Sequence, residues 1–133
     1  MASTMTVMVV SPEQVLFEGE GEMVVCRTTE GQIAFLPGHT PLLAALGTAK
    51  VRVIEPDGET TIAVHEGFVE VTGERVVVLS DIAELPDQID VERARTAKQQ
   101  AESELSSDPE NEKSKAALAR AELRLEVAGA LSG

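Results

Sequence analysis

The chain has 133 residues and a mass of 14.1 kDa, which leaves room for one ordinary domain with a small appendage and too little for two full-sized catalytic lobes. Twenty-three acidic residues against eleven Lys and Arg give a formal charge of −12, a field that repels phosphate backbones and argues against a general nucleic-acid binder. Trp and Tyr are absent and Phe occurs three times, which excludes an aromatic-lined ligand site.

The single cysteine, Cys26, excludes an internal disulfide and a multi-cysteine metal site, and its place in an apolar run predicts a buried, inert thiol. No segment approaches the ~18 apolar residues that a membrane-spanning helix needs. The first ten residues lack the basic start and the cleavage site of a signal peptide. We therefore expect a protein that is cytosolic or attached to something else.

The composition changes near residue 89. Thirteen of the sixteen Gly and Pro residues and fourteen of the sixteen Val residues lie at or before residue 88, which is typical of short strands joined by tight turns. After Ile89, the chain is rich in Ala, Glu, Arg and Gln at helical spacing. The sequence predicts a boundary within 84–90 and two parts, 1–88 with a net charge of −10 and 89–133 with a net charge of −2.

The first part predicts eight short strands. They span 4–10, 15–18, 23–29, 33–36, 50–55, 60–65, 68–72 and 75–79, with turn signals between them such as Pro37-Gly38-His39 and Pro56-Asp57-Gly58. Strands this short bury one face against a second sheet, so we expect an all-β sandwich or a flattened barrel.

The second part predicts two helices. Asp90 is expected to cap the first, over 91–106, and Pro109 follows its end; the second begins between residues 110 and 114. The expected apolar stripes are Ala94, Ala97, Ala101 and Leu105 on the first helix, and Leu118, Ala121, Leu125 and Ala128 on the second. The short break predicts an antiparallel hairpin. Because its seam is mostly alanine, the hairpin is held loosely and could open into a rod over 91–131 about 60 Å long.

No catalytic constellation is present. The chain has no Gly-x-Ser-x-Gly and no P-loop, and its two histidines, His39 and His65, lack metal-ligand spacing. Three arginines are more informative, because Arg93, Arg120 and Arg124 could converge in a closed hairpin, where guanidinium groups suit phosphate oxygens. Ordinary surface ion pairs are the alternative explanation for these arginines.

Several segments together resemble one family, the epsilon subunits of F-type ATP synthases. They are Val9-Val10-Ser11-Pro12, Leu16-Phe17-Glu18-Gly19, Leu36-Pro37-Gly38-His39-Thr40-Pro41-Leu42-Leu43, Gly67-Phe68-Val69-Glu70-Val71, Val78-Leu79-Ser80-Asp81-Ile82-Ala83-Glu84 and Ile89-Asp90. The Pro-Gly-His-x-Pro-Leu loop is the most specific of them. The resemblance implies an α+β chain: a sandwich of about ten strands over 1–88, followed by a two-helix hairpin over 89–133.

The resemblance implies a mechanical role without catalysis. The sandwich would dock on the gamma subunit and the c-ring and couple proton flow to rotation. The hairpin would extend toward the alpha and beta subunits and inhibit ATP hydrolysis. No cofactor would be required, and the protein would lie peripherally at the cytoplasmic face of the bacterial plasma membrane.

The resemblance also implies site residues. Some bacterial members bind ATP on the folded hairpin, and this chain matches their positions at Glu84, Ile89, Asp90, Arg93, Ala94, Arg120 and Arg124. Asp90, Arg93 and Glu84 would hold the nucleoside, and Arg120 and Arg124 the phosphates. A further arginine of those members is Gln100 here, so one phosphate contact is lost or shifts to Lys98. The partner-docking positions would be Glu30, Gly31, Gln32, Pro37, Gly38, His39 and Thr40.

Two other functions are compatible with the residues. One is a stand-alone nucleotide-sensing switch that uses the hairpin outside a rotary motor. The other is a generic protein-binding sandwich whose helical tail is a passive spacer.

Overall fold

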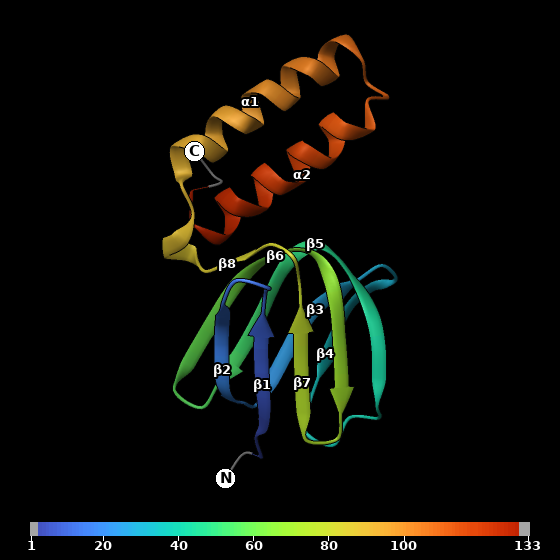
Figure 1. Cartoon of the computed structure of the whole chain (residues 1–133), viewed down its shortest axis with the longest axis vertical. Coiled ribbons are helices and arrows are strands. Elements are labelled where there is room, and N and C mark those ends of the chain that lie inside the picture. Colours follow the sequence, from blue (N-terminus) through green and yellow to red (C-terminus); the bar gives the residue numbers. More distant parts are fainter. Residues whose placement is uncertain (1–2, 131–133) are drawn as a thin grey trace. The chain divides into compact units, whose positions relative to one another are not determined.

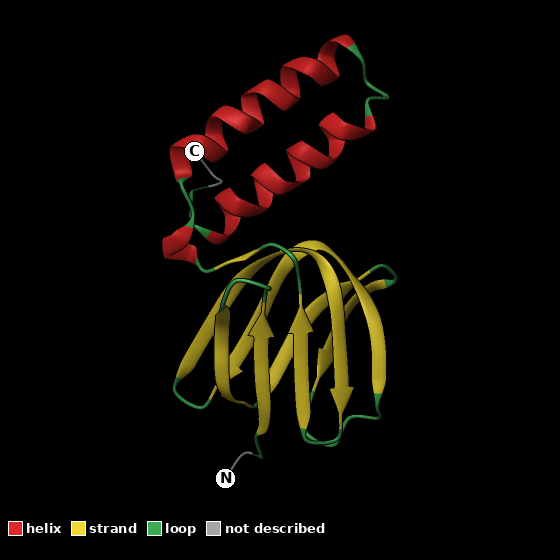
Figure 2. Cartoon of the chain, in the orientation of Figure 1, coloured by secondary structure: helices red, strands yellow, loops and turns green. Residues whose placement is uncertain are grey.

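The computed structural model describes residues 3–130. The chain forms two compact units, of which the first ends at Glu84 and the second begins at Leu85. Every β-strand of the described residues belongs to the first unit and both α-helices belong to the second (Figure 2). The last residues of the predicted rod and of the predicted second part, 131–133, lie outside the described residues.

The first unit contains eight strands in its described part (Figure 1). They are β1 (Met5–Val10), β2 (Val15–Gly21), β3 (Met23–Thr28), β4 (Gly31–Phe35), β5 (Leu42–Glu55), β6 (Gly58–Thr72), β7 (Arg75–Leu79) and β8 (Ala83–Glu84). Their order is β2-β1-β7-β6-β5-β3-β4, with β8 also paired to β6. β1 and β7 run parallel, and the other pairs are antiparallel.

The two long strands, β5 and β6, connect two layers. The first part of β5 and the last part of β6 continue into β7, β1 and β2, whereas their other parts adjoin β3, β4 and β8. The predicted sandwich is therefore confirmed. If β5 and β6 are counted once in each layer, the eight strands become ten strand segments. This number agrees with the sandwich of about ten strands that the resemblance implies.

The core of the sandwich follows the alternation of its strands. Inward-facing side chains of both layers are fully buried, and the largest are Phe35, Met5, Ile62, Val7, Val9, Val24, Val51, Val53, Val64, Val69, Val71 and Val76. Alternate residues of β1, β6 and β7 point to the opposite, outer face, since side chains along a strand alternate between its two faces. The predicted burial of Cys26 is confirmed.

A corner interrupts the pairing of β5 with β6. The register passes from Leu46↔Gly67 to Thr48↔His65, and Glu66 between them has a left-handed backbone with φ of 64°. A Cβ atom on Gly67 would lie 2.1 Å from the carbonyl oxygen of Leu79, so only glycine lets the two backbones approach this closely. Ser80 secures the corner, because its Oγ donates to the carbonyl oxygen of Glu66 at 2.6 Å.

The strand boundaries correct several predictions. The predicted strands 60–65 and 68–72 form one continuous strand, because Glu66-Gly67 bends β6 without ending it. β5 begins eight residues before the predicted strand 50–55, and β8 was not predicted at all. The non-alternating apolar run at the start of β5 does not carry the period-2 signal on which the prediction relied.

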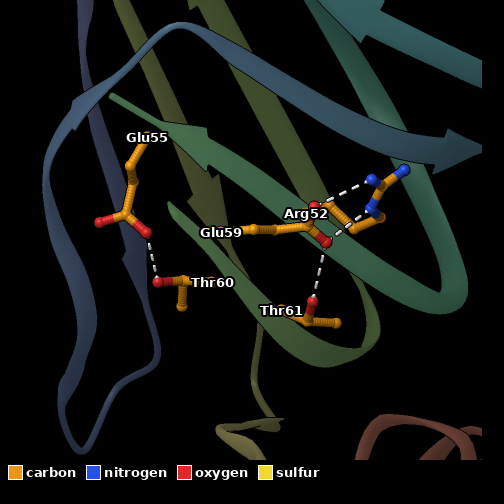
Figure 3. A network of polar contacts seen from close by, with 5 residues as sticks. All are labelled: Arg52, Glu55, Glu59, Thr60 and Thr61. Carbon is orange, nitrogen blue, oxygen red and sulfur yellow. Dashed lines mark hydrogen bonds and ion pairs between the residues drawn. The ribbon is translucent and has the colours of Figure 1, made fainter. Parts of the chain in front are cut away.

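A polar network lies at the other end of the β5–β6 pair (Figure 3). Arg52 donates from Nε and Nη2 to the two carboxylate oxygens of Glu59, at 2.9 and 3.0 Å, and Thr61 donates to the same carboxylate. The hydroxyl group of Thr60 donates to Glu55 at 2.7 Å. The two-pronged Arg52–Glu59 pair favours the observed strand register, in which Arg52 is opposite Thr61.

The second unit contains a short 3-10 helix, η1 (Pro86–Gln88), and the helices α1 (Val91–Ser107) and α2 (Glu112–Val127). Asp90 caps α1 as predicted, because its Oδ1 accepts from the backbone N–H of Arg93 at 3.1 Å. Asn111 caps α2 in the same way and was not predicted. The helices lie side by side, joined by residues 108–111 as an antiparallel hairpin (Figure 1).

The seam of the hairpin contains the predicted small residues. Ala94, Ala101, Ala121 and Leu125 are buried, and Ala97, Leu105, Leu118 and Ala128 are half-buried. Ser114 and Leu123 are also buried, although neither belongs to the predicted stripe.

Candidate functional site

The turn between β3 and β4 contains the first predicted docking segment. Glu30 and Gln32 are exposed, and Gly31 between them has a φ of 128°. The turn is closed by Thr28, whose Oγ1 donates to the carbonyl oxygen of Gly31 at 3.0 Å and accepts from the N–H of Glu30 at 3.1 Å. This segment therefore presents one carboxylate and one amide on a fixed backbone.

The loop between β4 and β5 contains the second predicted docking segment, Pro37, Gly38, His39 and Thr40. Gly38 has a φ of 85°, and its N–H donates to the carbonyl oxygen of Gly73 at 2.7 Å. The ring of His39 meets the ring of Phe35 edge-on at 5.0 Å, and its Nδ1 lies 2.6 Å from the carbonyl oxygen of Thr40. The aromatic contact with the buried Phe35 thus fixes the loop on the core.

The two predicted docking segments lie at opposite ends of β4, and the first part of β5 runs between them. That part carries Leu43, whose exposed fraction is 70%, and the exposed Ala45. The N–H of Thr29 donates to the carbonyl oxygen of Ala45 at 3.2 Å, which attaches the β3–β4 turn to this stretch of β5. The structure therefore links the two segments through an exposed apolar stretch.

An exposed apolar row crosses five strands from this point. Register pairs connect its members in the order Ala45, Phe68, Leu79, Val10 and Val15. Phe68 is 57% exposed, Leu79 50% and Val15 55%. We call this set, together with Leu43, the apolar row. Contiguous exposed apolar surface of this kind marks an interaction site in a folded protein.

Carboxylates border the apolar row. Glu70 is the register partner of Leu43. Glu18 is the register partner of Met8, which lies two residues before Val10 on β1. Both glutamates are exposed. Arg75, at the start of β7, donates from Nη2 to the sulfur of Met8 at 3.4 Å. A partner that covers this face would therefore meet apolar side chains beside negative charge.

The hairpin places the three predicted arginines on one flank. Successive residues turn about 100° around a helix. Arg93 immediately precedes the buried Ala94 on α1, and Arg120 immediately precedes the buried Ala121 on α2. Equivalent positions of two antiparallel helices lie on the same side of the pair. Arg124, four residues after Arg120, returns to within about 40° of it.

A contact between α1 and α2 shows which of their residues lie at the same level along the helix axes. Ser114 Oγ donates to Glu104 Oε1 at 3.0 Å, so residues whose numbers sum to about 218 lie at the same level. Arg93 is then level with Leu125, the residue after Arg124. Arg120 lies about one helical turn nearer the start of α2 than Arg124. Arg93 is exposed and the two arginines of α2 are half-buried. The flank thus carries three arginines, a residue type whose guanidinium group suits phosphate oxygens.

The other positions of the predicted ATP site have different surroundings. Ile89 and Ala94 are buried, and the carboxylate of Asp90 accepts the N-cap bond of α1. Glu84 belongs to the first unit, where its Oε1 lies 3.0 Å from Nε2 of the buried His65. Glu84 is therefore already bound by a side chain of the sandwich.

The apolar row and the His65–Glu84 pair were not predicted from the sequence. A signal for the row existed, because the runs at 42–46 and 76–79 are apolar at positions facing both sides of the sheet. Nothing local indicates the His65–Glu84 pair, whose members are nineteen residues apart.

Membrane-spanning helices and metal-binding clusters of side chains are both absent from residues 3–130. Within this range no helix is both long enough and apolar enough to cross a membrane. The same residues bring together no group of three His, Cys, Asp or Glu side chains able to hold a metal ion.

Comparison with known families gives two adjacent matches. Residues 4–86 match the β-sandwich domain of the ATP synthase delta/epsilon chain, and residues 87–129 match the long α-helix domain of the same chain. Together they cover nearly the whole sequence.

Known proteins agree with these matches. The chain is 49% identical over 104 residues to the ATP synthase epsilon chain of Brevibacillus brevis, covering 77% of this chain and 79% of the relative. It is 48% identical over 125 residues to that of Thermobifida fusca, covering 91% and 89%. A chain in the mitochondrial ATP synthase of Euglena gracilis, a structure of OSCP, F1 and the c-ring, has the same fold, with a TM-score of 0.71, 20% identity, and coverage of 97% of this chain and 79% of that one.

Proposed function

The chain belongs to the ATP synthase delta/epsilon chain family, and we propose that it acts as a non-catalytic central-stalk subunit of a proton-transporting F-type ATP synthase. In this function it transmits rotation between the membrane-embedded ring and the catalytic head. Catalysis belongs to other subunits. This proposal places the protein peripherally at the cytoplasmic face of the plasma membrane, held there by the complex.

The observation that carries this proposal is the apolar row. Its large side chains, Phe68, Leu79, Val15 and Leu43, are each at least half exposed and continue from strand to strand across one face. Burying half of such a side chain contributes about 1 kcal/mol. A row of four with its neighbours therefore supports stable docking, and we assign the gamma subunit as the partner that covers it.

The β3–β4 turn supports a second contact, with the c-ring. Glu30 and Gln32 are exposed and polar, and Thr28 holds the turn in one conformation. A rigid polar turn suits the contact with a polar loop because little conformational entropy is lost on binding. The Pro37–Thr40 loop, at the other end of β4, would extend the contact with the gamma subunit.

The hairpin supports regulation of ATP hydrolysis. Its seam consists largely of alanine at Ala94, Ala101 and Ala121, which contribute much less burial energy than leucine. A hairpin with a weak seam has a closed and an opened state that differ by a few kcal/mol. We assign the opened state to contact with the alpha and beta subunits and to inhibition of hydrolysis.

ATP is proposed as the ligand of the closed hairpin. The specific observation in its favour is the shared flank of Arg93, Arg120 and Arg124, whose guanidinium groups match the phosphate oxygens in shape and charge. At a hundredfold excess over its Kd, a ligand stabilises the state that binds it by about 2.7 kcal/mol. That amount is comparable with the few kcal/mol by which the closed and opened states differ. ATP concentration would therefore set the fraction of closed hairpin.

Copurification tests the stalk function. The tagged chain is coexpressed with the gamma subunit and the c-ring of the same complex, and both are expected to copurify with it. Removing residues 91–133 should leave assembly intact and raise ATP hydrolysis by the complex. Failure to recover either partner would reject the stalk function, and unchanged hydrolysis would reject only the inhibitory role.

Calorimetric titration with ATP tests the ligand. We expect binding by the unmodified chain and weaker binding by Arg93→Ala and Arg124→Ala. Arg95→Ala is the matched control, because Arg95 lies on another side of α1, where its guanidinium pairs with Glu92. Heats equal to those of buffer in the unmodified chain would reject ATP as the ligand and leave the stalk function standing.

A further inference from the structure

The two helices of the hairpin share a polar contact close to the turn that joins them. The hydroxyl group of Ser114, in the first turn of α2, donates to Oε1 of Glu104, in the last turn of α1, at 3.0 Å. Ser114 is 3% exposed, and its backbone N–H donates to Oδ1 of Asn111 at 3.1 Å. The serine is therefore held at both its backbone and its side chain.

The contact belongs to the closed hairpin alone. Residues 104 and 114 are ten positions apart, so they would be about 15 Å apart along the axis if the helices were arranged end to end. At that distance the hydrogen bond is broken. A contact that one state makes and the other lacks shifts the equilibrium between them by its own free energy.

The charge of Glu104 adds to the preference. Its carboxylate reaches the first turn of α2, where unpaired backbone N–H groups give the helix a partial positive charge. A hydrogen bond to a charged acceptor is stronger than one between neutral groups. In the opened hairpin this carboxylate would be solvated and separated from the helix terminus.

The rest of the seam does little to fix the position of one helix along the other. Ala94, Ala101 and Ala121 pack without polar groups, and such contacts tolerate sliding of one helix along the other. A buried hydroxyl with one acceptor does not, because sliding would leave it unpaired. The pair therefore sets the register of the closed state as well as its stability.

The geometry points to Glu104 and Ser114 as a latch that holds the hairpin closed. This inference rests on the opening of the hairpin described under the proposed function. Breaking the latch favours the opened state, whereas a ligand on the arginine flank and the latch both favour the closed one. The strength of the latch thus sets how much ligand is needed to keep the hairpin closed.

Distance measurement between spin labels in the full chain tests the latch. Labels are attached at Thr96→Cys and Ala119→Cys, two exposed positions on opposite helices far from the turn. The native Cys26 is buried and stays unlabelled. The labelled backbones are close in the closed hairpin, whose helix axes are about 8–10 Å apart, and about 35 Å apart in an opened rod.

Ser114→Ala is expected to raise the ratio of opened to closed hairpin about three- to tenfold. Alanine is the better helix former, so the change does not weaken α2 itself. Glu104→Ala should have the same effect, and Glu104→Gln, which keeps a neutral acceptor, a smaller one. The double variant Glu104→Ala with Ser114→Ala should open no further than either single variant.

Ser103→Ala and Glu102→Gln are the matched controls, since both residues are exposed on α1 away from the contact. The latch is overturned if Ser114→Ala changes the ratio less than twofold, if the controls change it equally, or if the effects of the two latch variants add. It is also overturned if every variant keeps one short distance and unchanged amide exchange in the first turn of α2. Copurification of the unmodified chain with the gamma subunit separately decides the stalk function.

Discussion

Gly67 is where a single methyl group should be most damaging to the sandwich. In Gly67→Ala the added Cβ would lie 2.1 Å from the carbonyl oxygen of Leu79 and 3.1 Å from the Cα atom of Ser80. Ordinary contact begins near 3.4 Å, so β6 and β7 must separate by more than 1 Å. Both neighbours are backbone atoms, which cannot move aside as the end of a flexible side chain can.

Forced separation of this kind costs about 3 kcal/mol, at the upper end of the range for overpacking. For a unit of this size each kcal/mol lowers the melting temperature by about 4–8 °C, so Gly67→Ala should melt about 12–24 °C below the unmodified chain. The variant should also weaken partner docking, because Leu79 and the adjacent Phe68 belong to the apolar row.

The neighbouring residue provides a control of opposite sign. Glu66 has a φ of 64°, which costs a residue with a side chain about 1–2 kcal/mol, whereas glycine adopts it freely. After subtraction of the greater freedom of glycine in the unfolded chain, Glu66→Gly should stabilise the sandwich by about 0.5–1 kcal/mol. Its melting temperature should rise by about 2–8 °C.

Both variants are measured by scanning calorimetry and far-UV circular dichroism, since the chain has no Trp or Tyr for fluorescence. Gly67→Ala should not melt within about 2 °C of the unmodified chain, and Glu66→Gly should not lower the melting temperature. Either of these two results would mean that the close approach at Gly67 or the left-handed backbone at Glu66 does not constrain the corner of β6.

Three further predictions concern single residues. Burial raises the pKa of the Cys26 thiol to about 12, so a thiol reagent at pH 8 should label it only after unfolding; stoichiometric labelling of the native chain would contradict this. Hydrogen bonds from Arg52 lower the pKa of the Glu59 carboxyl from its ordinary value of 4.5. The ion pair therefore stabilises the fold fully above pH 4.5, and this stabilisation is lost as the pH falls through the lowered pKa. Melting curves of Glu59→Gln should therefore differ slightly from those of the unmodified chain at pH 7 and merge with them in acid; a difference that grows in acid would refute the assignment. Asn111→Ala removes the cap of α2 and should cost about 1 kcal/mol, seen as earlier loss of the helical signal at 222 nm on heating, whereas an unchanged transition would exclude a stabilising cap.

The overall division of the chain could be predicted because its two parts have different periodicities. Valine with glycine and proline turns gave the sandwich, and Asp90 marked the start of α1 within one residue. The first part of β5 could not be predicted, since Leu42 and Leu43 are both apolar although only one side of the strand faces the core. Its outward face carries Leu43 and Ala45 of the apolar row, where the usual rule of polar residues on the outer face does not hold.

The candidate sites differ in how well the sequence predicts them. The common flank of the hairpin arginines follows from helical periodicity and an antiparallel turn, both of which are local properties. The apolar row depends on the register of five strands, and the His65–Glu84 pair depends on β8 returning to β6. Such long-range pairings are set by the whole fold, so no window of sequence contains them.

Docking through the apolar row can be measured as an affinity. The unmodified chain, the double variant Phe68→Ser with Leu79→Ser, and the control Ala34→Ser on the outer face of β4 are titrated against the purified gamma subunit with the c-ring. The double variant should still unfold in one cooperative transition, at a melting temperature lowered by loss of the half of each side chain that the fold buries. It should bind at least about tenfold more weakly, while the control binds as the unmodified chain does. Equal affinity of all three proteins would contradict docking through the apolar row.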